Sequence, residues 1–249
     1  MVLVGGPIAW PFDVVLNLGS VNMQPDLRAP VDGRRRVVVL QHGLFRTPAS
    51  MARLQRTLEA HGYEVLNPGY ASTQDRIEAH AVRLQTAIQG CAAAAAVDEW
   101  CFVGHSLGGL VIQEYLRSPG AVQPRAVVYL GTPHRGAMLA DLRKHWFLYP
   151  LLMGTAAAMQ LSPGDAFHRQ RLPWPERTGA IVGDLGAGNA VIPGNDDGTV
   201  AVDEATFPGA VAITHVAAGH TKLTVADEVL RQVLQFLRHG GFAPTLEGR

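Results

Sequence analysis

A six-residue stretch, Gly104 to Gly109, constrains the fold of this 249-residue chain more than any other feature. It reads Gly-His-Ser-Leu-Gly-Gly and contains the pattern G-x-S-x-G around Ser106. An apolar run at residues 100–103 precedes it and is typical of a buried strand. Residues 110–117 follow with helical character and stop near Pro119-Gly120. A strand, a tight turn and a helix in this order expose a serine hydroxyl as a nucleophile, and they predict an α/β fold.

Strand-like and helix-like segments alternate along most of the chain. Short apolar runs indicate buried strands at residues 37–40, 64–66, 100–103, 126–130, 180–182 and 210–213. Apolar residues at helical spacing indicate helices that begin near Thr47-Pro48, at Ser72 or Thr73, after Ser106 and near Val225. This alternation predicts a mostly parallel sheet of about six strands, flanked by helices, with its active site at the carboxyl ends of the strands.

The length and composition indicate one globular domain. Hydrophobic residues make up 47 % of the chain and charged residues 17 %, which is a globular rather than a disordered composition. We expect an N-terminal arm over residues 1–35, a single α/β domain over 36–240 and a tail over 241–249. Residues 137–178 break the alternation and predict a small cap insertion, although an ordinary core helix with a long loop explains them equally well.

The charge balance gives no reason to expect a nucleic-acid partner. Lys+Arg and Asp+Glu each number 21, so the net charge is zero with His neutral. The two cysteines have no zinc-binding spacing, and we expect neither a metal nor a cofactor. Residues 1–18 are apolar but lack a basic start and contain Gly and Pro, so they predict no signal peptide or membrane span. We expect a cytoplasmic protein, with secretion, weak contact with a lipid interface and homo-oligomerisation left open.

A serine nucleophile needs a base, and the base needs an orienting acid. In sheets of this kind the chain order is serine, then Asp or Glu, then His. His220 follows Gly219 on a loop after a predicted strand, so its imidazole can reach Ser106. His215 lies in or near that strand, and His42 precedes the serine and is expected to brace its loop. The remaining candidates are interpreted as surface or cap residues: His61, His80, His145, His168 and His239.

The acid is predicted from the loop after the strand at 180–182. Asp197 directly precedes Gly-Thr-Val in an Asp-Asp-Gly turn and is the favoured residue. Asp196 is its immediate alternative, and Asp184 follows the strand sooner. Too few carboxylates converge in this loop to predict a calcium site of the EF-hand kind.

Acyl transfer also needs backbone N–H donors for the negative oxygen that develops in the transition state. One is predicted at Leu107, at the N-terminus of the helix that follows the nucleophile, where the helix dipole helps. The second is predicted at Leu44, because Gly43 permits the bend that would point this amide into the site. Phe45 is the less suitable donor in the same loop.

Together these residues resemble a known family. The resemblance rests on His42-Gly43, the stretch from Gly104 to Gly109, Gly131-Thr132-Pro133-His134-Arg135-Gly136, Asp197-Gly198-Thr199-Val200 and Gly219-His220-Thr221. They are similar to the bacterial lipase and esterase group of α/β-hydrolases, in the compact branch related to glycosylphosphatidylinositol-inositol deacylase-like proteins. The resemblance spans roughly residues 36–240. The apolar arm before the first strand and the lack of a clear calcium-ligand set depart from it.

The resemblance implies Ser106 as nucleophile, Asp197 as acid, His220 as base and the amides of Leu44 and Leu107 as oxyanion donors. It also implies ester hydrolysis through an acyl-enzyme without a cofactor. Apolar side chains predict the substrate contacts, at Phe45, Met138 and Leu139, with Leu44, Leu107 and residues 146–153 as further candidates for an acyl pocket or lid. Burial in the core explains these apolar residues equally well.

The leading hypothesis is therefore a serine carboxylester hydrolase, an esterase or lipase, acting on small-molecule acyl esters. A thioesterase or an acyltransferase would use the same triad, because the acyl-enzyme is common and only the acceptor differs. A catalytically silent binding protein is an alternative from another class, since fold alone does not determine function. The intact set of Ser106, Asp197 and His220 argues against that alternative.

Overall fold

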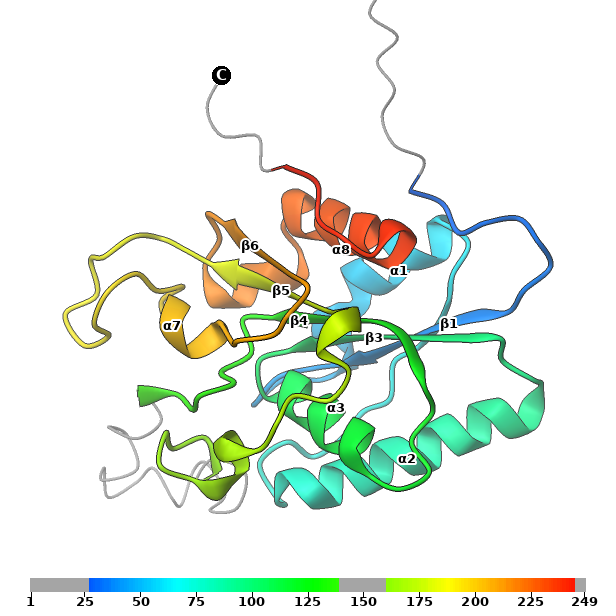
Figure 1. The fold of residues 1–249 in the computed structure, drawn as a ribbon, viewed down its shortest axis with the longest axis horizontal. Helices are drawn as coiled ribbons and strands as arrows, with labels where there is room; N and C mark the ends of the chain where they lie inside the picture. The colour runs from blue at the N-terminus through cyan, green and yellow to red at the C-terminus, as the bar shows by residue number, and fades with distance from the viewer. Residues whose placement is uncertain (1–26, 139–159, 245–249) are drawn as a thin grey trace, which may run out of the picture.

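The computed structural model describes residues 27–138 and 160–244, which form a single parallel sheet between two layers of helices (Figure 1). The strand order is β2-β1-β3-β4-β5-β6, and every neighbouring pair is parallel. The strands are β1 (Arg36–Gln41), β2 (Glu64–Leu66), β3 (Glu99–His105), β4 (Pro124–Leu130), β5 (Thr178–Gly183) and β6 (Ala212–Val216). The predicted mostly parallel sheet of about six strands is confirmed.

Helices cover both faces of this sheet. The described helices are η1 (Pro48–Met51), α1 (Ala52–Ala60), α2 (Ile77–Ala94), α3 (Leu107–Arg117), η2 (Ala166–Arg169), η3 (Pro175–Arg177), α7 (Val202–Ala205), η4 (His220–Thr224) and α8 (Asp227–His239), where η marks a 3₁₀-helix. Helices α2 and α3 lie together on one face, and α1 and α8 lie on the other (Figure 1). No helix within the described ranges has the length and apolar character that a membrane span requires.

The central strands are buried on both faces, which is why their sequences are continuous apolar runs. Val39 and Phe102 point to the face covered by α2 and α3 and belong to one core cluster. Leu40 and Val103 point to the other face and pack with residues of α1 and α8 in a second cluster. Successive side chains of a strand alternate between faces, so each apolar run contributes to both cores.

Most strands extend one or two residues beyond their predicted bounds at one or both ends, and three elements differ in other ways. The last strand is shifted from 210–213 to Ala212–Val216, because it is an edge strand that alternates buried Thr214 with exposed His215. The helix predicted to be capped at Ser72 or Thr73 begins instead at Ile77. The helix after Thr47 opens with one 3₁₀ turn before α1 begins.

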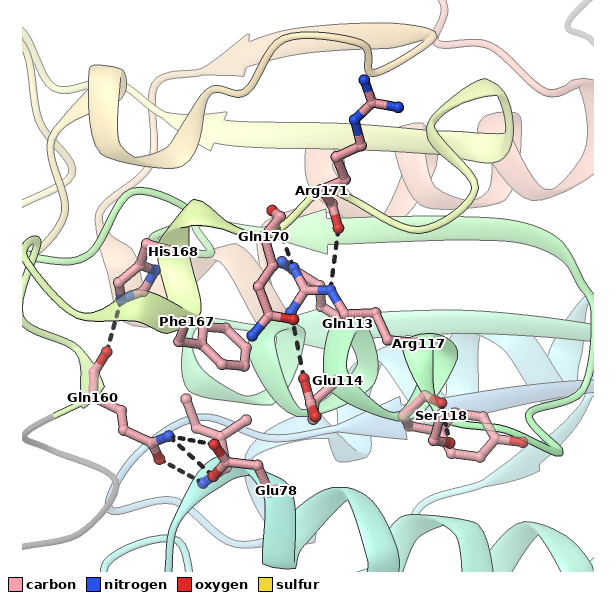
Figure 2. A network of polar contacts seen from close by, with 12 residues as sticks. Glu78, Gln113, Glu114, Arg117, Ser118, Gln160, Phe167, His168, Gln170 and Arg171 are labelled. Atoms are coloured by element: carbon pink, nitrogen blue, oxygen red, sulfur yellow. Dashed lines mark hydrogen bonds and ion pairs between the residues drawn. The ribbon is translucent and has the colours of Figure 1, made fainter.

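The chain after residue 159 is fixed to α2 by one glutamine (Figure 2). The side-chain oxygen of Gln160 accepts the N–H of Ile77 at 2.8 Å, and its amide nitrogen donates to both carboxylate oxygens of Glu78 at 2.9 and 3.0 Å. The first of these contacts occupies a backbone donor at the start of α2, which has no partner within the helix. Gln160 therefore acts as a cap supplied from a distant part of the chain.

A second attachment joins the same segment to α3 (Figure 2). The Arg117 guanidinium donates to the carbonyls of Gln170 and Arg171 at 3.3 and 3.1 Å, and its central carbon lies 5.1 Å from the centre of the Phe167 ring. Residues 160–171 of the predicted cap are thus fixed to the face of the molecule formed by α2 and α3.

Candidate active site

Ser106 lies in a strained turn between β3 and α3. Its φ of 55° is in the left-handed region, which costs a non-glycine residue on the order of 1 kcal/mol or more. The backbone N–H of Ser106 donates to the carbonyl of Leu130 at 3.0 Å, and its own carbonyl accepts the N–H of Gly109 at 2.9 Å. These bonds hold the turn in place, and the half-buried serine stands at the carboxyl end of β3.

The glycines of the motif are required by close packing. A Cβ on Gly104 would lie 2.5 Å from the Cα of Gly109. A Cβ on Gly108 would collide with the carbonyl oxygens of Gln41 and His42 at the end of β1. A Cβ on Gly109 would collide with the side chain of Thr132. The nucleophile turn therefore packs closely between the loops that follow β1 and β4. Only glycine fits at residues 104, 108 and 109.

His220 and Asp197 form a buried hydrogen-bonded pair. The Nδ1 of His220 lies 2.7 Å from the Oδ2 of Asp197, whose side chain is 1 % exposed. The other carboxylate oxygen accepts the backbone N–H groups of Thr199 at 2.9 Å and Val200 at 2.7 Å. Donation from Nδ1 leaves Nε2 of the neutral imidazole with a free lone pair, as a general base requires.

The two alternative acids contact other groups. Asp196 is also buried, but its Oδ1 accepts the N–H of Gly198 at 2.6 Å. The Oδ2 of Asp184 lies 3.4 Å from the Nδ1 of His215, which is half exposed in β6. Of the three aspartates considered from the sequence, Asp197 is the one that hydrogen-bonds His220.

The segment that follows β4 joins the serine to this pair. Leu130, which accepts the Ser106 N–H, is followed by Gly131 with a φ of 53°. A Cβ on Gly131 would lie 3.1 Å from the Oδ2 of Asp197 and 3.2 Å from the Nδ1 of His220. The three residues predicted as the triad therefore converge at the carboxyl ends of neighbouring parallel strands.

His105, the residue before the nucleophile, contacts the backbone and the ring of His220. It was not predicted as a site residue. Its Nε2 donates to the backbone carbonyl of His220 at 2.9 Å, and the two ring centres are 4.8 Å apart. Burial, and then the neighbouring His220, lower the pKa of His105 to about 3. His105 is therefore neutral at physiological pH and adds no positive charge beside the proposed base.

The loop of residues 42–46, called the β1 loop below, follows β1 and contacts the nucleophile turn. A Cβ on Gly43 would lie 3.0 Å from both the Cβ of Ser106 and the Nδ1 of His105. Phe45 has a left-handed φ of 57°, and its N–H donates to the Oγ of Ser72 at 3.1 Å. Because that N–H is occupied, Leu44 is the better placed donor of the two candidates in this loop.

The predicted substrate contacts are only partly described. Phe45, in the β1 loop, is 49 % exposed, and Met138 is 37 % exposed. The N–H of Met138 donates to the Oε1 of Glu204 at 2.6 Å, and burial raises the pKa of that carboxyl group. Leu139 and residues 146–153 lie outside the described residues. Among the described ones, no group of three or more His, Cys, Asp or Glu is arranged to hold a metal ion.

One histidine prediction is wrong. His80 is predicted as a surface or cap residue, yet it lies in α2 with 1 % exposure, and its ring packs edge-on against Tyr70 at 4.6 Å between centres. The sequence offered one signal for this, since His80 lies at helical spacing from the buried Ile77 and Leu84. A polar residue on the buried stripe of a helix indicates an internal contact.

Comparison with solved structures places the chain among proteins of the α/β-hydrolase fold. The lipase BlEst2 of Bacillus licheniformis in its mature form has a TM-score of 0.65 and 19 % identity, covering 84 % of this chain and 96 % of that one. The metagenomic carboxyl esterase MGS0156 has a TM-score of 0.58 and 18 % identity, covering 84 % and 75 %. The lin2722 product of Listeria innocua has a TM-score of 0.57 and 16 % identity, covering 82 % and 94 %.

Comparisons by sequence give no family. No protein-family model matches the chain. No curated protein matches it at a significant level either. The likeness to solved structures therefore establishes the fold, and the activity has to be argued from the site.

Proposed function

We propose that this chain is a serine hydrolase of carboxylic esters that works through an acyl-enzyme. The observation that carries the proposal is the 2.7 Å contact between the Nδ1 of His220 and the Oδ2 of Asp197, beside the strained turn that presents Ser106. This arrangement supplies a nucleophile, a base with a free Nε2 and an acid that orients it.

The proposed reaction follows from these roles. The Oγ of Ser106 attacks the ester carbonyl carbon while the Nε2 of His220 takes its proton, and the carbonyl oxygen becomes an oxyanion. The N–H groups of Leu44 and Leu107 would hold that charge. Collapse of the tetrahedral intermediate breaks the bond to the alcohol, which leaves with the proton from His220. Water then attacks the acyl-serine by the same route and releases the acid.

Acyl esters are the proposed substrate class. The exposed Phe45, in the loop that contacts the nucleophile turn through Gly43, and the exposed Met138 offer apolar contacts to an acyl chain. Two of the similar structures are a lipase and a carboxyl esterase, which is consistent with this class. We also propose the compact lipase-like branch, related to glycosylphosphatidylinositol-inositol deacylase-like proteins, on the motifs that suggested it.

Hydrolysis of a p-nitrophenyl ester series from two to sixteen acyl carbons tests the proposal. We expect turnover by the wild-type chain and a loss of about 10⁴-fold or more in kcat for Ser106→Ala and His220→Ala, because each removes a member of a unit that acts together. The preferred chain length separates an esterase from a lipase. A wild-type chain that neither turns over any ester nor reacts with a fluorophosphonate at Ser106 would favour the silent binding protein instead.

A further inference from the structure

The β1 loop contains three consecutive peptide groups, of which the middle one carries the N–H of Leu44. The first joins residues 42 and 43, the second joins 43 and 44, and the third joins 44 and 45. Two residues from the segment between β2 and α2, Tyr70 and Ser72, contact the first and the third of these groups. We propose that Tyr70 and Ser72 are positioning residues that hold the Leu44 N–H ready for the substrate oxygen. This inference rests on the proposed function.

Tyr70 holds the first peptide group. Its hydroxyl donates to the carbonyl of His42 at 2.7 Å, and the two rings are stacked with centres 4.4 Å apart. Burial raises the pKa of Tyr70 above its usual value, so the hydroxyl keeps its proton and remains a donor at every pH at which the protein would work. His80 packs edge-on against Tyr70, with 4.6 Å between ring centres, and restricts its ring.

Ser72 holds the third peptide group. Its Oγ accepts the Phe45 N–H at 3.1 Å, and the side chain is only 4 % exposed. The Arg46 N–H donates to the Gly43 carbonyl at 3.2 Å, so residues 43–46 form a β-turn with left-handed Phe45 at its third position. That position suits glycine or asparagine, and phenylalanine there is strained. Rotating the third peptide group would relieve the strain, and the hydrogen bond to Ser72 opposes this rotation.

The middle peptide group is thereby fixed from both sides. Its carbonyl, on Gly43, accepts the Arg46 N–H and also lies 3.0 Å from the Nδ1 of His42. The peptide is trans, so the N–H of Leu44 points away from these two contacts. No residue of the described ranges accepts a hydrogen bond from this N–H in the folded chain. A donor held in position and left without an acceptor is what oxyanion stabilisation requires.

The inner side of the loop is closed by the nucleophile turn. The carbonyls of Gln41 and His42 lie against the Cα of Gly108, so the loop cannot move inward. Tyr70 and Ser72 add restraints of their own, at the His42 carbonyl and at the Phe45 N–H. Without them the loop has room to change its peptide orientations, and the oxyanion donor would be in place for only part of the time.

The test compares Tyr70→Phe and Ser72→Ala with the wild type on the best p-nitrophenyl ester. Removing an oxyanion donor outright costs about 10² to 10³ in kcat. Loosening one should cost less, and we expect kcat to fall about tenfold in each variant with KM changed less than about threefold. Affinity for a boronic acid, whose adduct with Ser106 places an anionic oxygen against the same donors, should fall in parallel. Ser72→Thr, which keeps the hydroxyl, should restore most of kcat.

Two matched controls remove hydroxyls that do not contact the β1 loop peptides. Tyr115→Phe removes a buried tyrosine hydroxyl that accepts the Val122 N–H at 3.0 Å. Ser50→Ala removes a hydroxyl that donates to the Thr47 carbonyl at 2.8 Å. Both should keep kcat within about twofold of the wild type, since neither alters the Leu44 amide.

The outcomes separate this inference from the proposed function. An active wild type with kcat and boronate affinity unchanged in Tyr70→Phe and Ser72→Ala overturns the inference and leaves the proposed function standing. A rise in KM alone, with kcat unchanged, also overturns it. A wild type inactive on esters and unreactive with fluorophosphonate overturns both. If Tyr70→Phe does not fold, the contrast between Ser72→Ala and Ser72→Thr decides the question.

Discussion

Asp196 and Asp197 are adjacent in the sequence and both are buried, yet their carboxylates have different hydrogen-bond partners. Asp197 accepts two backbone N–H groups on one oxygen and contacts His220 with the other. Asp196 uses one oxygen to close the turn onto Gly198, and its second oxygen has no partner within the described residues. The sequence left both as candidates because either residue of an Asp-Asp-Gly turn can point inward.

Asparagine substitutions separate the two aspartates. Asp197→Asn keeps the shape of the side chain but can present an N–H group to His220, which disfavours the tautomer that has its lone pair at Nε2. We expect kcat on a p-nitrophenyl ester to fall by about 10² to 10⁴, with more residual activity than Ser106→Ala. Asp196→Asn keeps the Oδ1 contact to Gly198 and should stay within about threefold of the wild type. An inactive Asp196→Asn beside an active Asp197→Asn would reverse the assignment.

At the scale of elements, glycine has opposite roles in two helices of the same face. Gly108 lies in the first turn of α3, where a Cβ would collide with the backbone carbonyls of Gln41 and His42. Gly90 lies near the end of α2, where a Cβ would meet nothing within 4 Å. The first glycine is required by packing, whereas the second weakens the helix that contains it, since glycine costs about 0.5 to 1 kcal/mol relative to alanine inside a helix.

Alanine substitutions at these positions should therefore change stability in opposite directions. Gly90→Ala should raise the free energy of unfolding by about 0.5 to 1 kcal/mol. Gly108→Ala should lower it by about 1 to 3 kcal/mol or more, because the colliding atoms belong to backbone that cannot move aside. Urea denaturation followed by circular dichroism measures both. Equal effects at the two positions would mean that Gly108 of α3 does not lie in close contact with the carbonyls of Gln41 and His42.

The elements that could be predicted from sequence are those whose burial is complete. Central strands such as β1 and β3 are buried on both faces, so their continuous apolar runs are unambiguous. The edge strand β6 alternates instead, and the apolar run at 210–213 placed it two residues early. Ser72 resembled a helix cap by residue type alone. Its hydroxyl instead accepts the N–H of Phe45 in the β1 loop, 27 residues earlier in the sequence. Contacts between distant segments leave no local pattern.

The same limit applies to the site. The G-x-S-x-G turn and the order of serine, aspartate and histidine are visible in the sequence. The order, together with a position on a loop directly after Gly219, selected His220 among ten histidines. Tyr70 and His105 were not found, because what defines them is a contact with the backbone carbonyls of His42 and His220. A carbonyl group is present at every residue, so no residue type or spacing marks its partner.

For the molecule as a whole, buried histidines link stability to pH. Within the described ranges, burial lowers the pKa of His42, His80, His105 and His134. For His105 and His134 the value is about 3. His105 and His134 therefore stay neutral in the folded state between pH 6.5 and 5, while in the unfolded chain histidines bind protons below about pH 6.5. Folding stability is therefore lost as the pH falls below 6.5, by up to about 1.4 kcal/mol per pH unit for each fully shifted histidine.

Carboxylates change the folding stability at a lower pH than the histidines do, or in the opposite direction. Asp184 and Glu228 have lowered pKa values, owing to hydrogen bonds that outweigh burial, so the stability they contribute is lost only below about pH 4. Burial raises the pKa of Glu204. This carboxyl group therefore stabilises the folded protein more as the pH falls, and it offsets part of the destabilisation caused by the histidines. The loss between pH 6.5 and 5 consequently belongs to the histidines.

His134 provides the test of this pH dependence. Its Nδ1 lies 3.0 Å from the Oε1 of Gln113, and the charges of His168 and Arg117 add to burial in keeping it neutral. Asparagine places an N–H group where Nδ1 was but does not titrate. We expect His134→Asn to reduce the slope of unfolding free energy against pH, between 6.5 and 5, by up to about 1.4 kcal/mol per pH unit. Urea denaturation at several pH values measures this slope in His134→Asn and in the wild type. An identical slope in the two would mean that His134 binds its proton in the folded state, and that acid unfolding has another source.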